Sequence, residues 1–235
     1  MPPVARTSVT NRLFDALPLR ARRPVLEQCE LVEMTFGEVL CEPGERIRDV
    51  YFPTSGLISL IAVLDDPASI EVALIGNEGM LGVPLVLGVD ISPLRAVVQG
   101  NGGALRMQGA HFRRVLAGSP ILRRRLDAYI YVLLAQLSQT AACACFHLLE
   151  ARLAYWLLMS QDRARSDRFY LTHSLLADML GVRRSGVTTA AGALQRRKLI
   201  RYSRGGITIL DRKGLELASC GCYDVINTAY DRLSA

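Results

Sequence analysis

Two adjacent arginines and several short hydroxyl side chains lie in one stretch of the C-terminal third of the chain. Residues 181–200 read GVRRSGVTTAAGALQRRKLI. A guanidinium group presents a planar fork of N–H donors, which fits a phosphate or the O6 and N7 acceptors of guanine. On a helix, one face would be apolar and the opposite face would carry Arg184, Ser185, Thr188 and Thr189, with Arg183 directly before it. This pattern favours contact with a polyanion.

The charge of the surrounding segment supports this interpretation. Residues 163–213 contain twelve basic and three acidic residues, a net charge of +9, whereas the rest of the chain has a net charge of −3. Such an asymmetry indicates a negatively charged partner. The alternative is a buried helical hairpin whose basic face is only solvated.

The cysteines and histidines suggest a second kind of chemistry. Cys143 and Cys145 lie close to His147, and Cys220 and Cys222 form another Cys-x-Cys pair. These residues could ligate a metal if the two pairs came together. Residues i and i+2 of a helix point to nearly opposite sides, however, so we expect small, reduced, buried thiols and no metal site. A redox- or metal-responsive role for the cysteines stays open as an alternative.

The sequence gives little support for an enzyme. The three histidines all lie outside residues 31–107, the region predicted to form strands, which argues against a metal-dependent cupin. No pairing of a nucleophile with a base stands out either. We therefore expect no catalytic residues.

The elements that would position the basic face form a helix-turn-helix. Ala177 is small where two helices would touch, Gly181 suits a turn with positive φ, and Val187 would fill the angle between the helices. Thr172 or Ser174 could cap the first helix. Two short apolar runs then flank Gly205-Gly206, predicted as a two-residue hairpin turn. Together these signals predict a winged helix-turn-helix.

The preceding part of the chain predicts a strand domain followed by a long helix. Residues 31–107 contain many short apolar runs separated by turn residues, which is typical of an antiparallel roll. Ser119-Pro120 begins a long helix. Its stripe Leu126, Ile130, Leu133 and Leu137 has coiled-coil spacing, and a second apolar set comprises Leu122, Tyr129, Val132 and Leu134. We expect the stripe to pair two subunits; the alternative is burial of both faces within the monomer.

The whole chain resembles the Crp/Fnr family of bacterial transcription regulators, most specifically in the segment LLADMLGVRRSGVTTAAGALQRRKLI. The resemblance implies an α+β fold with a sensor β-roll like a cyclic-nucleotide-binding domain (1–118), a dimerisation helix (119–146) and a DNA-binding winged helix-turn-helix (147–235). It implies base reading by Arg184, Ser185 and Thr189. The full set of expected DNA contacts is Thr172, His173, Ser174, Arg183, Arg184, Ser185, Thr188, Thr189 and Arg204.

The resemblance also locates an effector pocket, in which the match fails. Family members that bind a cyclic nucleotide use a Gly-Glu pair and, about ten residues later, an arginine followed by Ser or Thr. Here Gly82 and Arg95 fit, but Val83 replaces the glutamate and Ala96 replaces the hydroxyl residue. Valine cannot accept a hydrogen bond from the ribose, and an unpaired buried hydroxyl costs about 1–3 kcal/mol. We therefore expect the pocket not to bind cyclic AMP, and name no cofactor.

These observations predict a homodimeric regulator that binds a palindromic site on double-stranded DNA in the cytoplasm. The resemblance implies RNA polymerase as a further partner. No secretory signal is visible, and we expect no membrane association. The competing hypothesis from another class is a signalling module that binds a nucleotide but no DNA.

Overall fold

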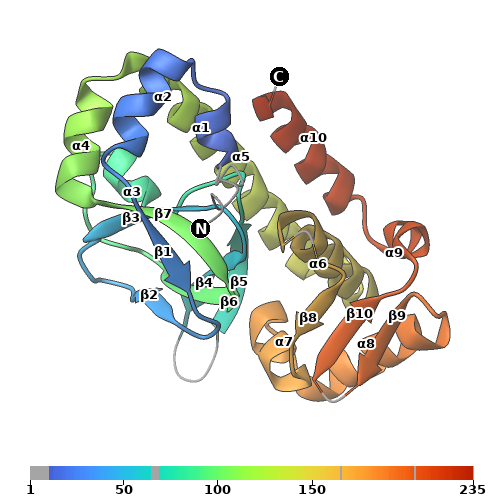
Figure 1. Ribbon diagram of the computed structural model, residues 1–235. Coiled ribbons are helices and arrows are strands. Elements are labelled where there is room, and N and C mark those ends of the chain that lie inside the picture. The colour runs from blue at the N-terminus through green and yellow to red at the C-terminus, as the bar shows by residue number, and fades with distance from the viewer. Residues whose placement is uncertain (1–10, 65–68, 165, 204, 235) are drawn as a thin grey trace, which may run out of the picture.

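Two antiparallel sheets form the N-terminal half of the computed structural model, which describes residues 11–64, 69–164, 166–203 and 205–234 (Figure 1). The first sheet has the order β1-β7-β3, with bounds Glu30–Met34, Gly102–Gln108 and Asp49–Pro53. The second has the order β2-β6-β4-β5, with bounds Val39–Cys41, Arg95–Gly100, Leu57–Val63 and Ser69–Ile75. Side chains from both sheets, among them Met34, Ala104, Ile58 and Val98, share one buried cluster. The predicted roll is confirmed.

Short helices cover one end of this roll. They are α1 (Arg12–Asp15), α2 (Leu19–Leu26), α3 (Val83–Val86) and α4 (Gly109–Ala117). Asn11 caps α1 by accepting a hydrogen bond from the Leu13 N–H, and its amide donates to the carbonyls of Pro53 and Gly79 at 2.9 Å. A fully buried Asn11 thereby fixes α1 to the roll.

The long helix α5 (Pro120–Phe146) crosses from the roll to the C-terminal half. Ser119 caps it as expected, accepting from the Leu122 N–H. The prediction that the leucine stripe pairs two subunits is wrong, however. Leu126, Ile130 and Leu133 are buried against the chain's own roll. Of the second set, Leu122, Tyr129 and Val132 are buried too, whereas Leu134 is exposed.

The exposed side of α5 carries a different row. Its exposed positions include Tyr131, Leu134, Ser138, Ala141 and Cys145, spaced 3, 4, 3 and 4 residues apart. Tyr131 and Leu134 expose 70% and 56% of their surface. Among the described residues, α5 is the one helix long and apolar enough to cross a membrane, with 33% of its most apolar stretch buried. The core helix of a soluble protein can have the same length and hydropathy.

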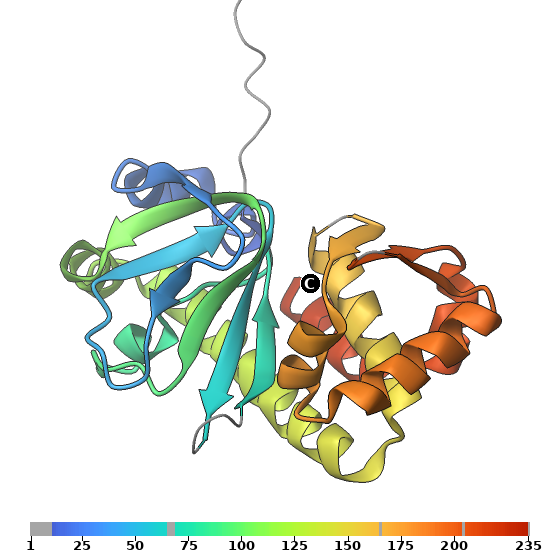
Figure 2. The same cartoon turned by 90° about the horizontal axis from the view of Figure 1, so that it is seen from below.

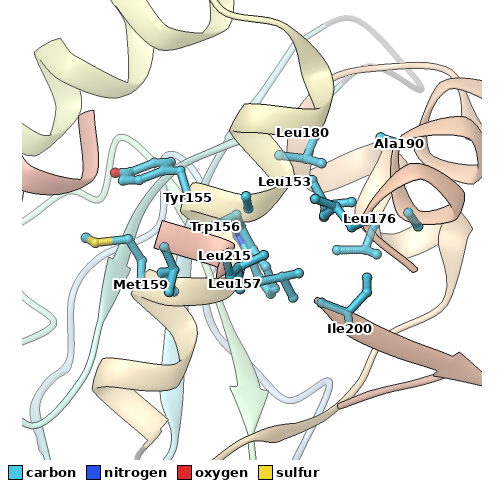
Figure 3. Packing of buried hydrophobic residues seen from close by; sticks show 14 of the residues in the cluster. Leu153, Tyr155, Trp156, Leu157, Met159, Leu176, Leu180, Ala190, Ile200 and Leu215 are labelled. Carbon is cyan, nitrogen blue, oxygen red and sulfur yellow. The ribbon is translucent and has the colours of Figure 1, made fainter. Parts of the chain in front are cut away.

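The C-terminal half is a helical unit with a small sheet. Its elements are α6 (Leu149–Ala164), β8 (Arg168–Tyr170), α7 (His173–Leu180), α8 (Arg184–Arg196), β9 (Ile200–Ser203), β10 (Gly206–Ile209), α9 (Arg212–Ala218) and α10 (Cys222–Ser234). The strands have the order β8-β10-β9. Gly206 pairs with Ser203 as the first residue of β10, so it lies in the strand rather than in the predicted Gly205-Gly206 turn. Figure 3 shows the core of this unit around α6, where Leu153, Trp156 and Leu157 meet Leu176, Ala190 and Ile200.

Helix α10 returns along α5, next to which it lies in Figure 1. The Tyr230 hydroxyl donates to the Gln136 side-chain oxygen at 2.9 Å. Arg163 of α6 lies over the Tyr230 ring, 4.9 Å from its centroid. The last helix therefore joins α5 and α6.

Figure 2 shows the two halves side by side. The polar side chains that join them are almost fully buried. The Trp156 indole of α6 donates to Glu71 of β5 at 2.6 Å, and Ser59 of β4 donates to the same carboxylate. Arg163 forms an ion pair with Glu78 at 2.9 Å. Burial raises the pKa of Glu71 from its ordinary value of 4.5 to about 7, although both hydrogen bonds oppose this shift.

Candidate nucleic-acid interface

The turn between α7 and α8 has the geometry that the sequence predicted. Thr172 caps α7 by accepting from the Leu175 N–H at 3.2 Å. Gly181 ends α7 in the left-handed region at φ +64°, and the Val182 N–H donates to the Ala177 carbonyl at 2.9 Å. Val187 is fully buried in the core that also contains Ala177. All three residues of the predicted helix-turn-helix spacing therefore act as expected.

The first turns of α8 present the predicted polar face to solvent. Arg183, Arg184, Ser185, Thr188 and Thr189 are all exposed, whereas Val187, Ala190, Ala191 and Leu194 of the same helix are buried. Among the described residues, neither Arg183 nor Arg184 forms an ion pair. Both guanidinium groups are therefore available to a partner.

The two threonines of this face are partly engaged within the helix. Thr188 and Thr189 donate their hydroxyl protons to the carbonyls of Arg184 and Ser185, each at 3.1 Å. The methyl groups of both threonines and the hydroxyl lone pairs of Thr189 remain for a partner. Such side chains can accept a hydrogen bond from a base or contact a thymine methyl.

His173 has a different environment from the one expected of a phosphate contact. Its ring stacks on Tyr202 with the centroids 4.2 Å apart, and Nδ1 lies 3.0 Å from the Thr188 hydroxyl oxygen. Because that hydroxyl donates its one proton to the Arg184 carbonyl, the His173 Nδ1–H donates to the Thr188 hydroxyl oxygen. The other ring nitrogen, Nε2, is buried without a hydrogen-bond partner among the described residues. Burial, with a smaller contribution from Arg184, lowers the pKa of His173. His173 thus holds α7, α8 and β9 together.

The remaining expected contacts are less constrained. Thr172 and Ser174 are exposed at the start of α7, so they stay predictions as phosphate contacts. Arg204 lies outside the described residues. Sequence reasoning did not single out Arg201, whose side chain is exposed on β9. The Gln195 side-chain oxygen accepts from the Tyr202 N–H at 2.8 Å, which fixes the end of α8 to β9.

A cavity of about 660 Å³ lies between the roll and α5. Gly82 and Val83 line it, as expected of the effector pocket. The wall is mostly apolar, and α5 contributes Ile130, Leu133, Leu134 and Leu137. Gly82 has φ +105°, and a Cβ there would lie 2.6 Å from Val50, so glycine is required. The volume is in the range of small-molecule sites.

Arg95 and Ala96 do not line this cavity, which corrects the expected pocket. Arg95 forms an ion pair with Glu42 at 2.8 Å, and its side chain is 42% exposed. Ala96, the next residue of the strand, points to the other face and is fully buried in the roll. Asp90, five residues before Arg95, pairs with Arg46.

The structure also brings together four cysteine and histidine residues that the sequence analysis interpreted as separate. The ligand atoms of Cys143, His147, Cys220 and Cys222 all lie within 4.8 Å of one another. Cys145 is exposed and is not part of the group. The condition set for metal ligation, that the two pairs come together, is therefore met by Cys143, Cys220 and Cys222, and the expected burial fails only for Cys145 of these two pairs.

Comparison with known proteins identifies the C-terminal unit. Residues 151–218, which include most of α6 and the whole helix-turn-helix, match the family described as the Crp-like helix-turn-helix domain. None of the curated proteins matches the chain. The helix-turn-helix inferred from Ala177, Gly181 and Val187 is thus supported independently of the coordinates.

Solved structures share the complete architecture. A transcriptional regulator of the Crp/Fnr family from Eubacterium rectale is 16% identical with a TM-score of 0.68, and the match covers 88% of this chain and 96% of that one. A CRP-family regulator from Thermus thermophilus is 18% identical with a TM-score of 0.68, covering 80% and 96%. FixK2 from Bradyrhizobium japonicum is 15% identical with a TM-score of 0.66, covering 82% and 98%. The chain therefore has the Crp/Fnr fold.

Proposed function

We propose that this chain, which combines the Crp/Fnr fold with a Crp-like helix-turn-helix domain, is a transcription regulator that binds palindromic double-stranded DNA as a homodimer. The observation that carries the proposal is the exposed start of α8, where two arginines without ion pairs adjoin three hydroxyl side chains. In this geometry α8 enters the major groove, and the positive charge of residues 163–213 attracts the phosphates.

Within that surface, we assign two kinds of contact. Arg184, Ser185 and Thr189 read base edges, and Arg184 is suited to guanine. Thr172, Ser174, Arg183 and Arg204 contact phosphates and fix the register, whereas His173 positions Thr188. We assign the three roles to the expected residue ranges: the sensor roll to 1–118, the dimerisation helix to 119–146 and the DNA-binding unit to 147–235.

The homodimer rests on the exposed row of α5. Tyr131, Leu134, Ser138, Ala141 and Cys145 follow the 3–4 spacing of a coiled-coil seam, and small residues in its second half permit close helix approach. A second copy of the chain would bury this row about a two-fold axis. The proposed dimer thus uses a side of α5 that lies about a quarter of a turn around the helix from the leucine stripe singled out in the sequence.

The effector, if the regulator has one, differs from cyclic AMP. The arginine expected to neutralise its phosphate pairs with Glu42 outside the cavity, and Val83 offers no acceptor to a ribose hydroxyl. The cavity is lined mainly by apolar side chains and shares its wall with α5. An effector with an apolar body would therefore act directly on the helix proposed to form the dimer.

Binding of the purified chain to randomised DNA, with selection and sequencing of the bound fraction, tests the proposal. We expect a two-fold symmetric consensus and an observed affinity that falls steeply as salt rises. A nucleotide-binding signalling module would enrich no sequence and would show no such salt dependence. The same chain at rising concentration in a sedimentation experiment tests the homodimer separately.

A further inference from the structure

Two segments distant in sequence meet at the end of α5. Cys143 lies in the last turn of α5 and His147 directly follows this helix. Cys220 lies between α9 and α10, and Cys222 is the first residue of α10. Cys143, Cys220 and Cys222 are buried, and His147 is at the surface. One imidazole and three thiols thus form a closed group at a junction of helices.

The distances within this group fit one tetrahedral ion. The sulfur atoms of Cys143 and Cys220 are 3.5 Å apart, and His147 Nδ1 is 3.3 Å from the Cys222 sulfur. A tetrahedral zinc ion with Zn–S bonds of about 2.3 Å and Zn–N bonds of about 2.0–2.1 Å separates its ligands by roughly 3.5–3.8 Å. All four ligand atoms here lie within 4.8 Å of one another. Small side-chain adjustments would therefore suffice to place an ion between them.

Helix geometry explains why these four residues converge and Cys145 does not. Cys143 and His147 are four residues apart, so they lie on the same side at the end of α5. Cys145, two residues from Cys143, points away and is exposed. The Gln139 amide, one turn before Cys143, donates to the Cys222 sulfur at 3.0 Å. Such a donor orients a thiolate ligand from outside the coordination sphere.

We propose that Cys143, His147, Cys220 and Cys222 bind one zinc ion in a tetrahedral Cys3His site. Soft thiolate ligands with one imidazole favour zinc over magnesium, calcium or manganese. Four protein ligands leave no open position, which is typical of a structural rather than a catalytic site. The ion would link the start of α10, within the proposed DNA-binding unit, to the end of α5.

Metal analysis of the full-length chain, prepared under reducing conditions with zinc in the growth medium, tests this site. We expect close to one zinc ion per chain after removal of loosely bound metal. Cys220→Ser and His147→Gln should each lose most of the zinc, with affinity at least about tenfold weaker. The matched control Cys145→Ser, which changes a neighbouring exposed thiol outside the group, should keep its zinc.

Cobalt substitution in the unaltered chain gives a test that does not depend on variants folding. After chelation, added Co²⁺ should produce the strong visible bands of a tetrahedral thiolate complex, which stoichiometric Zn²⁺ should displace. His147→Gln, altered only at the surface, should shift these bands.

Two metal measurements would overturn the proposal: a metal-free wild-type protein with no tetrahedral cobalt spectrum, or full zinc retention in both ligand variants. Iron with acid-labile sulfide in place of zinc would also overturn it. So would a Cys143–Cys220 disulfide in the reduced, zinc-supplied protein. None of these measurements involves DNA, so the metal site and the regulator function can fail independently.

Discussion

Arg184 and His173 lie on the same surface of the helix-turn-helix, but their side chains are held in opposite ways. The Arg184 guanidinium is exposed and forms no ion pair among the described residues, whereas His173 is enclosed between Tyr202 and Thr188. A free guanidinium can adjust to a base edge, while an enclosed ring can only position its neighbours. The geometry therefore separates a reading residue from a positioning residue.

Replacing Arg184 by alanine should weaken binding to the selected site by about 1–3 kcal/mol and relax the preference at one base pair in each half-site. The reason is loss of a bidentate contact to guanine. Competition binding against the selected site and its single-base variants measures both effects. Arg23→Ala, which removes the same charge from the distant helix α2, is the control. Equal losses on selected and random DNA would assign Arg184 to the phosphates instead.

The carboxyl of Glu71 should make the stability of the chain depend on pH. It ionises near pH 4.5 when unfolded but near pH 7 when buried, so the folded chain holds a proton that the unfolded chain has lost. Its contribution to the free energy of unfolding is therefore complete below about pH 4.5 and is lost as pH rises to about 7. This loss is on the order of 3 kcal/mol.

Denaturant unfolding at several pH values between about 5 and 8 measures this dependence. Glu71→Gln, a neutral side chain of the same shape, should flatten the decrease and exceed the wild type in stability at the alkaline end. Glu33→Gln, at an exposed position on β1, should follow the wild-type curve. A Glu71→Gln curve parallel to that of the wild type would contradict the assignment.

At the residue scale, the sequence predicts positions fixed by backbone geometry better than positions fixed by tertiary contacts. Gly181, Ala177 and Val187 were identified because a tight turn between helices restricts their types. The pairing of Arg95 with Glu42 could not be foreseen, because the two residues are 53 positions apart and meet only when β2 pairs with β6.

Helix α5 is the element that most parts of the molecule share. One side fills the core of the roll, another lines the cavity, and α10 covers a third. The exposed row of Tyr131, Leu134, Ser138, Ala141 and Cys145 remains, with Tyr131 and Leu134 as its large apolar members. This row is the surface of α5 that we propose a second subunit covers.

Tyr131→Glu should shift the proposed dimer toward monomer, because two carboxylates would replace the largest apolar side chains at the start of the proposed seam. Sedimentation velocity at a series of concentrations measures the shift. Leu217→Glu, at an even more exposed apolar position on α9, should leave the assembly unchanged. A wild-type chain that sediments as a monomer at micromolar concentration would contradict the dimer itself.

At the scale of elements, the sequence located α5 and its cap but misjudged which side it buries. Both sides carry apolar residues, so periodicity alone could not say which faces the roll. The sequence analysis did not predict α10. Tyr223, Ile226 and Tyr230 recur at helical spacing, so the signal was present in the sequence. Their packing on α5 and α6, which places the helix, could not be predicted from that spacing.

For the whole molecule, the two α8 helices of a symmetric dimer should enter successive major grooves. The half-sites of the operator would then be centred about 34 Å apart, one turn of DNA. Inserting five base pairs between the half-sites should abolish tight binding, and inserting a full turn should restore part of it. Gel-shift titrations with these spacings measure the effect, and indifference to spacing would argue for independent binding of single subunits.

Cyclic AMP should neither bind measurably at micromolar concentration nor alter DNA affinity. The expected phosphate partner, Arg95, lies outside the cavity, and Val83 offers no hydrogen-bond acceptor. Calorimetric titration, with operator binding followed in parallel, tests this. Saturable binding that also tightens the operator complex would contradict it, because an effector and DNA that favour one conformation must strengthen each other.

The one tryptophan of the chain, Trp156, lies where the roll meets the DNA-binding unit and donates its indole N–H to Glu71. Its fluorescence emission therefore reports whether the roll and the DNA-binding unit remain in contact at this point. If an effector, a bound operator or an ion at the end of α5 pulled α6 away from β5, the indole would exchange a buried carboxylate for water and its fluorescence would move to longer wavelength. The protein thus carries a label-free optical signal for any rearrangement between sensing and DNA binding.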